Sequence, residues 1–236
     1  MYFLFSGEGS TDTGSGNVID TICEGDNYEP GPMAVITDQL YRSKHGKSFI
    51  SDRQCGFISK NALQKKAKTS RPEKKSPKLP GKKRAKETGY FYHNARALAL
   101  WAKEKQNVRK ETVTGVLFRD CDSQQRGVWQ DKWQSMLNGF MDASFDHGVP
   151  MLPKPISEAW LLCALGKKPY QNCAALEIRS SSPSAKNPIK ADLRKKCDGK
   201  ISRSDLCTLI ESGKVDALRI NMPSFNAFKS RLIEVI

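Results

Sequence analysis

Residues 115–123 read GVLFRDCDS, an apolar run about one strand long that ends in two closely spaced aspartates. Residues 2–12 read YFLFSGEGSTD and have the same form, an apolar run followed by small residues and two acidic ones. In open α/β sheets, ligands bind at the carboxyl ends of the strands. The two stretches therefore predict an α/β fold with four carboxylates at one edge of its sheet. These are Glu8, Asp12, Asp120 and Asp122.

Four carboxylates at one edge of a sheet repel one another unless a cation neutralises them. Oxygen-rich clusters suit Mg²⁺ or Mn²⁺, which use a few carboxylates together with water and substrate phosphate. Asp120 and Asp122 are alternate residues, so on an extended segment both reach one metal ion or two adjacent ones. The alternatives stay open: an ordinary loop pair for these two, an acidic turn for Glu8, and a helix cap for Asp12.

A fifth acidic candidate is Glu158, in the first turn of the apolar helix that is expected to follow Pro155. A carboxylate is favoured there by the positive end of the helix dipole alone. The functional alternative is a further metal ligand or general base that faces the same edge.

The remaining pattern predicts strands and helices in alternation. Strands are expected at 2–6, within 48–58, at 112–119 and at 149–152; helices are expected at 32–44, for about four turns from near Gly89, at 129–145 and at 158–165. This order favours a mostly parallel sheet with helices on both faces. We expect residues 1–165 to form the catalytic domain. Residues 166–236 would then form a mainly helical extension, with helices at 205–210 and 224–236.

The formal net charge of +14 is concentrated in one segment. Residues 60–87 hold twelve Lys or Arg and two Glu, a local charge of +10, together with three prolines. We interpret this segment as an irregular, mobile insertion that binds nucleic acid. A solvated loop or a surface for an acidic partner protein remain alternatives. The candidate binding residues are Lys74, Lys75, Lys82, Lys83 and Arg84.

The seven cysteines contain no C-x-x-C pair, so neither a zinc knuckle nor a redox motif is indicated. The first residues lack the basic region of a secretory signal, and no stretch approaches the ~20 apolar residues that a membrane-spanning helix needs. We therefore expect a reduced, cytoplasmic protein that does not enter a membrane.

Three short motifs occur in an order that resembles a known family. They are the G-E-G-x-T-D form at residues 7–12, the strand end FRDCD at 118–122, and P-x-x-E-A-W-L-L at 155–162. Together they are similar to the TOPRIM fold of topoisomerases, primases and OLD-type nucleases. The likeness is greatest to the small bacterial TOPRIM-like proteins encoded beside ABC-type ATPases in phage-defence loci. The MPSF sequence at 222–225 also resembles the tail of that group.

The resemblance implies a Mg²⁺-dependent nuclease that cleaves DNA or RNA, including tRNA. It also implies that the protein is the effector of a phage-defence system and that its partner is an ABC-type ATPase. It implies that Glu8 is a general acid/base or metal ligand, with Asp12 beside it. It also implies that Asp120 and Asp122 are metal ligands and that Glu158 is the later acidic position. The long basic segment is not a recognised feature of the family.

Two other functions remain open at this stage. One is a catalytically silent TOPRIM-like module that binds nucleic acid or regulates an ATPase. The other is a haloacid-dehalogenase-like phosphatase, in which Asp120 is the nucleophile and Asp122 the acid/base. That fold places its D-x-D after the first core strand, whereas here at least two strands precede it.

Overall fold

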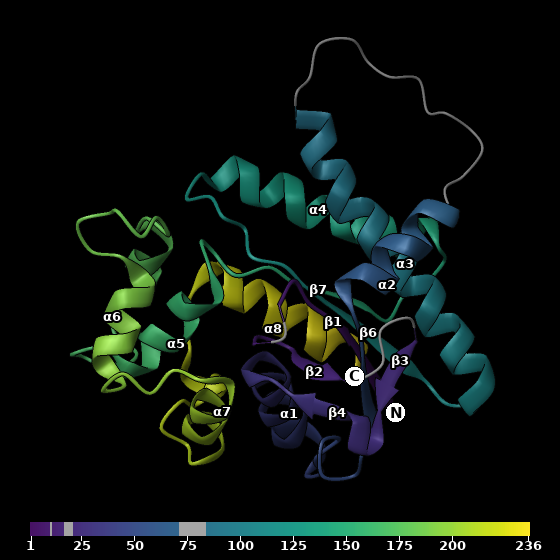
Figure 1. The fold of residues 1–236 in the computed structure, drawn as a ribbon, viewed down its shortest axis with the longest axis horizontal. Coiled ribbons are helices and arrows are strands. Elements are labelled where there is room, and N and C mark those ends of the chain that lie inside the picture. The colour runs from purple at the N-terminus through teal and green to yellow at the C-terminus, as the bar shows by residue number, and fades with distance from the viewer. Residues whose placement is uncertain (10, 17–20, 71–83) are drawn as a thin grey trace.

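The computed structural model describes residues 1–9, 11–16, 21–70 and 84–236, although the side chains of residues 84–87 and 126 are not described. Its centre is a five-stranded sheet with the order β3-β5-β1-β6-β7 (Figure 1). The four strands β5, β1, β6 and β7 are parallel, and the edge strand β3 is antiparallel to β5. The strands are β1 (Tyr2–Ser6), β3 (Ile22–Glu24), β5 (Cys55–Ile58), β6 (Val113–Phe118) and β7 (Gly148–Met151). The predicted α/β class with a mostly parallel sheet is thus confirmed.

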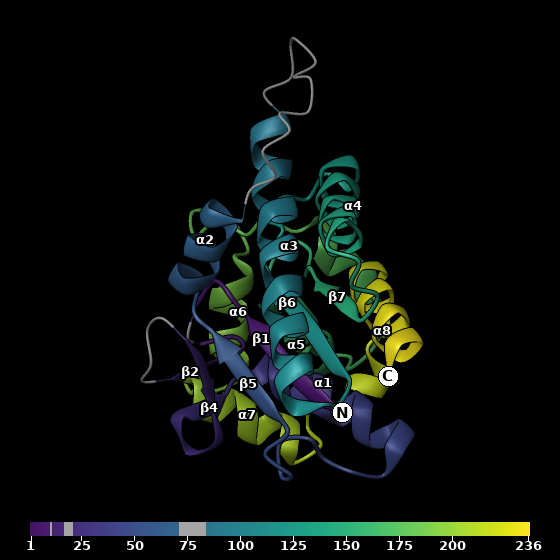
Figure 2. The ribbon, with the colours of Figure 1, turned by 90° about the vertical axis from the view of Figure 1, so that its right-hand side faces the viewer.

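Helices cover both faces of this sheet (Figure 2). One face carries α2 (Lys60–Thr69), α3 (Arg84–Arg109) and α4 (Arg126–Asp142). The other carries α1 (Pro32–His45), α5 (Ser157–Leu165) and α8 (Pro223–Val235). A short antiparallel pair, β2 (Gly14–Gly16) and β4 (Tyr28–Pro30), stands beside the sheet, and the turn η1 (Gly25–Asn27) precedes β4.

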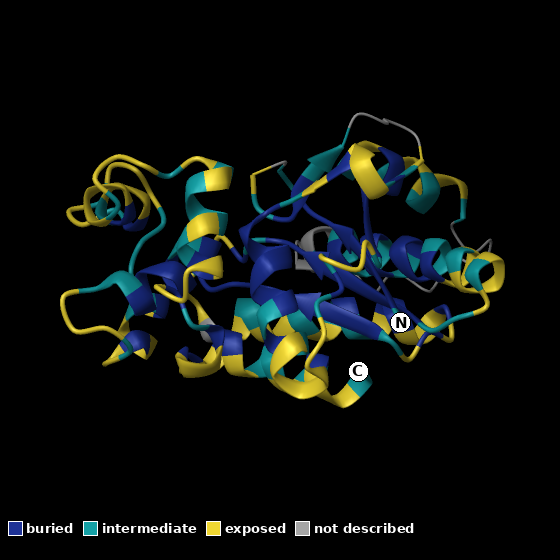
Figure 3. Cartoon of the chain, turned by 90° about the horizontal axis from the view of Figure 1, so that it is seen from below, coloured by how far each residue is buried: buried dark blue, intermediate teal, exposed yellow. Residues whose placement is uncertain are grey.

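Strand β1 shows why both faces need a cover. Phe3 and Phe5 belong to the hydrophobic cluster on the α1 side, whereas Tyr2 and Leu4 belong to the cluster on the α3 side. All four side chains are 0% exposed. Successive strand residues point to opposite faces, so an uninterrupted apolar strand must be buried on both. The sheet accordingly forms the buried centre of the molecule in Figure 3.

The C-terminal extension packs onto the α1 side of the sheet. It contains η2 (Cys173–Ile178), α6 (Ile189–Lys196), α7 (Arg203–Glu211) and η3 (Ala217–Arg219) before it ends in α8. The ring of Trp160 in α5 lies 4.9 Å from that of Phe225 and 5.7 Å from that of Phe228, both in α8. The buried apolar residues of the extension therefore belong to the same cluster as those of α5.

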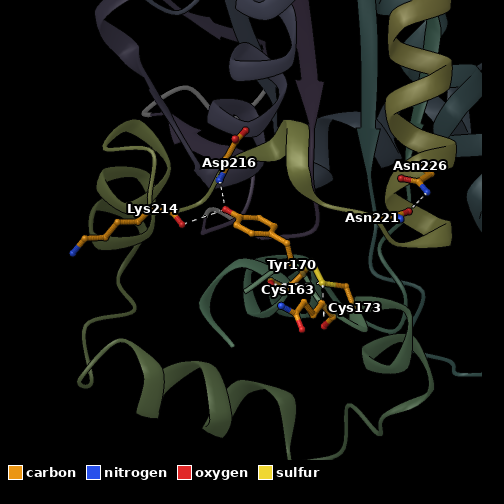
Figure 4. The surroundings of a disulfide bond; sticks show 8 residues. Cys163, Tyr170, Cys173, Lys214, Asp216, Asn221 and Asn226 are labelled. Carbon is orange, nitrogen blue, oxygen red and sulfur yellow. Dashed lines mark hydrogen bonds between the residues drawn. A yellow bond between two sulfur atoms is a disulfide. The ribbon is translucent and has the colours of Figure 1, made fainter. Parts of the chain in front are cut away.

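A disulfide joins the end of α5 to the start of η2. The Sγ atoms of Cys163 and Cys173 are bonded at 2.02 Å (Figure 4). Nearby, the hydroxyl of Tyr170 accepts a hydrogen bond from the Asp216 backbone N–H at 2.8 Å and donates one to the Lys214 carbonyl at 3.4 Å. This pair differs from the expectation that the cysteines are reduced, because the fold brings together two residues that form no recognisable pairing motif.

The expected irregular insertion at 60–87 is wrong at both of its ends. Residues 60–69 form α2, because the Ser59 hydroxyl caps the helix by accepting from the Ala62 backbone N–H at 3.2 Å, and because Ala62 and Leu63 are buried. Residues 84–87 already belong to α3, which is longer than expected. The centre of the predicted mobile segment, 71–83, lies outside the described residues.

The strand expected within 48–58 is confined to residues 55–58. Before it, the Asp38 carboxylate accepts hydrogen bonds from the Ser48 hydroxyl at 2.9 Å and from the Ile50 backbone N–H at 3.2 Å, which hold a turn instead. Among the described residues, no helix is both long enough and apolar enough to cross a membrane.

Candidate active site

The strands end level with one another at the carboxyl edge of the sheet. Ser6 of β1 pairs with Leu117 of β6, and Phe118 of β6 pairs with Met151 of β7. Beyond these strands the two chains continue side by side. The Cys121 N–H donates to the Pro153 carbonyl at 3.0 Å, and the Asp122 N–H donates to the Pro155 carbonyl at 2.9 Å. This pairing carries the D-x-D segment to the N-terminus of α5.

Ser157, the first residue of α5, joins three of the predicted acidic residues. Its backbone N–H donates to Asp120 Oδ1 at 2.9 Å, and its hydroxyl lies 2.9 Å from Asp12 Oδ1 and 3.5 Å from Glu158 Oε2. Ser157 is 2% exposed. Three carboxylates from separate parts of the sequence therefore surround one buried serine, and we call this group the Ser157 cluster.

The loop after β1 is held in place by close backbone contacts. The Met33 N–H donates to the Asp12 carbonyl at 2.9 Å, where the chain enters α1. Gly31 packs directly on this loop, since a Cβ there would lie 2.4 Å from the Asp12 carbonyl oxygen. Gly7 has the same constraint, because a Cβ would lie 2.1 Å from Thr13 Oγ1. The start of α1 and the two glycines thus fix the position of Asp12.

The cluster is costly to ionise. Burial raises the pKa of Asp120 well above its ordinary range, and the neighbouring charges of Asp12, Glu158 and Asp122 raise it further. Burial also raises the pKa of Asp12, with a further contribution from Glu158, while the Ser157 hydroxyl and Lys190 act in the opposite direction. Asp12, Asp120 and Glu158 nevertheless keep part of their surface open to solvent, and Asp122 is exposed. A ligand can therefore reach these carboxylates.

Lys190 is the cation that the structure supplies to this cluster. Its Nζ lies 3.3 Å from Glu158 Oε1, and its side chain is 63% exposed. The charge of Glu158 is the largest cause of the raised pKa of Lys190, and Asp120 and Asp12 contribute in the same direction. The sequence analysis did not identify Lys190, because it lies in a polar segment without a motif. The apolar pair Ile189 and Leu193, four residues apart, is the signal that indicates the helix carrying it.

Glu8 is placed differently from the other acidic candidates. Its Oε1 lies 3.7 Å from Nε of Arg119, whose side chain is 0% exposed, while Glu8 is 32% exposed. Burial lowers the pKa of the Arg119 guanidinium, and Tyr90 and Glu8 raise it. Within the described part of the chain, Arg119 Nε and Nη2 have no hydrogen-bond partner. Glu8 therefore pairs with a buried arginine, and no contact with the Ser157 cluster is found among the described residues.

A hard divalent cation fits the chemistry of this cluster. Its donors are carboxylate oxygens, and burial together with the neighbouring carboxylates raises the pKa of Asp120 and Asp12. In the described ranges, no three His, Cys, Asp or Glu side chains already have a geometry that would hold a metal ion. Mg²⁺ commonly uses only one or two carboxylates, with water and substrate phosphate as its other ligands. A site completed by substrate is consistent with both observations.

The predicted nucleic-acid-binding residues lie mostly outside the part of the chain that the structure describes. Lys74, Lys75, Lys82 and Lys83 lie outside the described residues, and Arg84 is the first residue of α3, with no description of its side chain. In the comparisons with known proteins, no family model, no curated protein and no solved structure matches this chain.

Proposed function

We propose that this protein is a metal-dependent nuclease that hydrolyses phosphodiester bonds of RNA or DNA at the Ser157 cluster. The observation that carries the proposal is the meeting of Asp12, Asp120 and Glu158 around Ser157 at the carboxyl edge of a parallel sheet. In open α/β folds, ligands bind at the carboxyl edge of the sheet. The TOPRIM-like family, the role of effector in phage defence and an ABC-type ATPase partner belong to the same proposal. They rest on the sequence motifs alone.

The residues of the chain divide the work as follows. Asp12, Asp120 and Glu158 would hold the metal ion, with Asp122 beside them. When bound, Mg²⁺ or Mn²⁺ supplies Lewis-acid stabilisation of charge on the phosphate. Ser157 fixes the orientation of the Asp12 and Asp120 carboxylates through its hydroxyl and backbone N–H.

Two basic residues complete this division. Lys190 brings a positive charge to the cluster and can neutralise the non-bridging oxygens of the substrate phosphate. Arg119 holds the carboxylate of Glu8 at the end of the strands that lead to the cluster. From this position Glu8 can accept a proton from the bound substrate or return one to it.

A catalytically silent module is the second candidate, and one observation favours it. The ion pair between Lys190 and Glu158 already gives the cluster a cation without any metal. A protein that uses its carboxylates only to anchor the extension would need no further ion. It would bind nucleic acid or regulate a partner without cleaving anything.

The deciding experiment is a cleavage assay of the purified chain on tRNA, messenger RNA and DNA, with Mg²⁺, with Mn²⁺ and with EDTA. We expect cleavage that requires the metal and that disappears in Asp120→Asn. The matched control is Asp52→Asn, an exposed aspartate in the turn before β5, which should cleave like the wild type. Absence of cleavage on every substrate, together with retained nucleic-acid binding, would establish the silent module instead. Phosphate release from small monoesters with a phosphorylated Asp120 would establish the phosphatase.

A further inference from the structure

The C-terminal extension carries a basic hollow of its own. The hollow measures about 490 Å³ and lies between the η2–α6 loop and α6. Its charged lining residues are Arg179, Lys186, Asp192 and Lys195. We call this feature the extension hollow. It lies on α6, which stands beside α5 at one end of the molecule (left in Figure 1).

The C-terminal extension contains a second basic segment besides residues 60–87. Residues 179–203 contain eight Lys or Arg and two Asp, a net charge of +6. The sequence outside both segments is therefore slightly acidic, since the whole chain carries +14 and residues 60–87 carry +10. The net positive charge of the protein thus comes from these two segments, and the extension hollow lies in the second of them.

The hollow is positively charged even after its internal ion pair is counted. Arg179 Nη1 lies 3.0 Å from Asp192 Oδ2, and Arg179 Nη2 donates to the Asn187 carbonyl at 2.8 Å. This leaves Lys186 and Lys195, which are exposed and for which the described residues provide no acidic partner. Two uncompensated lysines that face one concavity attract an anion with more than one charged group.

The walls of the hollow are held by the core. Ile189 and Leu193 of α6 are 0% and 1% exposed and belong to the hydrophobic cluster under the extension. The Arg179–Asp192 pair ties the preceding loop to the same helix. Lys195 therefore projects from an anchored helix, and Lys186 from the loop that this ion pair joins to it, which lowers the entropic cost of binding.

Helix α6 contributes Lys190 to the Ser157 cluster and Asp192 and Lys195 to the hollow, on different sides of the helix. Lys190 pairs with Glu158, and Lys195 follows five residues later on α6. Five helical residues rise about 7.5 Å. The two residues are also rotated by about 140° about the helix axis, at 3.6 residues per turn, so a nucleic-acid strand that contacts both lysines has to pass around α6.

From the charge of the hollow and its attachment to the core we infer that it binds backbone phosphates of the nucleic acid that we propose is cleaved at the Ser157 cluster. The inference rests on the proposed nuclease function, because it takes the substrate to be a nucleic acid. Binding is electrostatic and independent of sequence, since lysine and arginine contact phosphate groups and none of the described residues that line the hollow is aromatic. The extension therefore serves as part of the substrate-binding surface.

The test uses the full chain with the double substitution Lys186→Ala/Lys195→Ala. The matched control is Lys47→Ala/Lys110→Ala, two exposed lysines in the α1–β5 and α3–β6 connections at the opposite, amino edge of the sheet. Fluorescence anisotropy gives the Kd for labelled single-stranded RNA, single-stranded DNA and duplex DNA over a range of salt concentrations. EDTA is present throughout, so binding is measured without metal-dependent cleavage.

We expect the double variant to bind more weakly and its slope of log K against log salt to flatten. The loss should be about 1.4 for single strands and about 1.8 for a duplex, which corresponds to two lost phosphate contacts. The control should keep the wild-type slope. Unchanged affinity and slope in the double variant would overturn the inference, as would weakened binding of polyglutamate with unchanged binding of nucleic acid, which would identify a surface for an acidic protein.

A parallel assay with Mg²⁺ separates this inference from the nuclease proposal. If the wild type and the double variant cleave with the same KM, the inference fails and the nuclease proposal stands. If the salt slope changes as expected but no nucleic acid is cleaved, the nuclease proposal fails and the hollow remains a phosphate-binding surface. If the wild type binds no nucleic acid at all, both fail.

Discussion

Lys190 Nζ lies 3.3 Å from Glu158 Oε1, so a residue of the C-terminal extension neutralises a carboxylate at the edge of the central sheet. The charge that balances this acidic cluster thus comes from a segment distant in sequence from the strands that build it. Because a divalent cation at the proposed site would need the same carboxylates, Lys190 would compete with it for them. Substitutions at Lys190, Asp120, Ser157 and Glu8 test this ion pair and the contacts around it.

The substitution Lys190→Gln should raise the affinity for metal and lower the rate of cleavage. Removing Nζ leaves Glu158 without its partner, so Mn²⁺ should bind several-fold more tightly, as measured by calorimetry. At saturating metal, kcat should fall because a charge near the substrate phosphate is lost. Arg194→Gln, one turn further along α6, is the matched control. Equal metal affinity in Lys190→Gln and the wild type would show that the ion pair does not occupy the metal position.

The metal-free protein should become less stable as the pH rises above about 4. The pKa of Asp120 is raised in the folded state from its ordinary value of 3.8, so the folded protein binds this proton more tightly than the unfolded chain. The free energy of unfolding therefore falls between the ordinary and the raised pKa, and the full loss is present above the latter. Asp12 acts in the same direction.

Asp120→Asn tests this relationship directly. Thermal melting in EDTA should show a higher midpoint for the variant than for the wild type at pH 7, and a smaller difference at pH 4. Mg²⁺ should raise the midpoint of the wild type and leave that of the variant nearly unchanged. A variant that melts below the wild type at pH 7 would mean that the Asp120 carboxylate is stabilising in the absence of metal.

Ser157→Ala should weaken the site without disturbing α5. The hydroxyl contact to Asp12 is lost, whereas the backbone N–H still reaches Asp120 and the helix keeps Ile156 as its N-cap. Replacing a hydrogen-bond partner of a metal ligand typically lowers metal affinity or activity about 10- to 100-fold. We expect the metal concentration needed for cleavage to rise by a similar factor.

Ser202→Ala is the control for the loss of a serine hydroxyl. Ser202 caps α7 by accepting from the Asp205 N–H at 3.2 Å, and no contact between Ser202 and the acidic cluster is found among the described residues. Its replacement should cost about 1 kcal/mol of stability and leave the metal dependence unchanged. Similar metal curves for both variants would show that Ser157 does not position the carboxylates.

Glu8→Gln should destabilise the fold as well as impair cleavage. Removing one partner of a buried ion pair leaves the other charge uncompensated, which costs about 3 kcal/mol at the lower end of the usual range. The lower end applies because Glu8 is 32% exposed, whereas Arg119 is 0% exposed. The surface pair Arg53–Asp26 is the control, and Asp26→Asn should cost less than about 1 kcal/mol.

The double variant Glu8→Gln/Arg119→Met separates the two roles of Glu8. Stability should return towards the wild type, because the buried charge has been removed together with its partner. If Glu8 takes part in proton transfer, cleavage stays lost in this stable protein. Recovery of cleavage along with stability would assign Glu8 a purely structural role.

The sequence predicts the centre of the fold because its strands are strongly patterned. Strands β1 and β6 are apolar throughout, which indicates burial on both faces, and α1 begins at Pro32 as expected. Helix α2 escaped prediction because its lysines dominated the composition, although Ala62 and Leu63 suffice to anchor one face. Helix α6 has only Ile189 and Leu193 to identify it in a polar segment.

Of the carboxylates that the sequence analysis expected together, Asp12, Asp120 and Glu158 meet around Ser157, whereas Glu8 pairs with Arg119 instead. Asp12, Asp120 and Glu158 follow or adjoin strand ends, and the topology brings them together. Serine is a residue type that often caps helices, whereas Ser157 lies inside the first turn of α5 and contacts Asp12 and Asp120 from two separate segments. The positions of Lys190 and of Arg119, the partner of Glu8, depend on side-chain directions and long-range packing. A local sequence pattern does not contain this information.

The aromatic contact between α5 and α8 gives this protein an internal optical reporter. Trp160 is 0% exposed and packs against Phe225 and Phe228, while the other three tryptophans are partly exposed. Its emission should therefore be blue-shifted and shielded from acrylamide. Since Trp160 lies two residues after Glu158, a shift of the extension away from the sheet would change that emission. Loosening near the acidic cluster can thus be followed without attaching a dye.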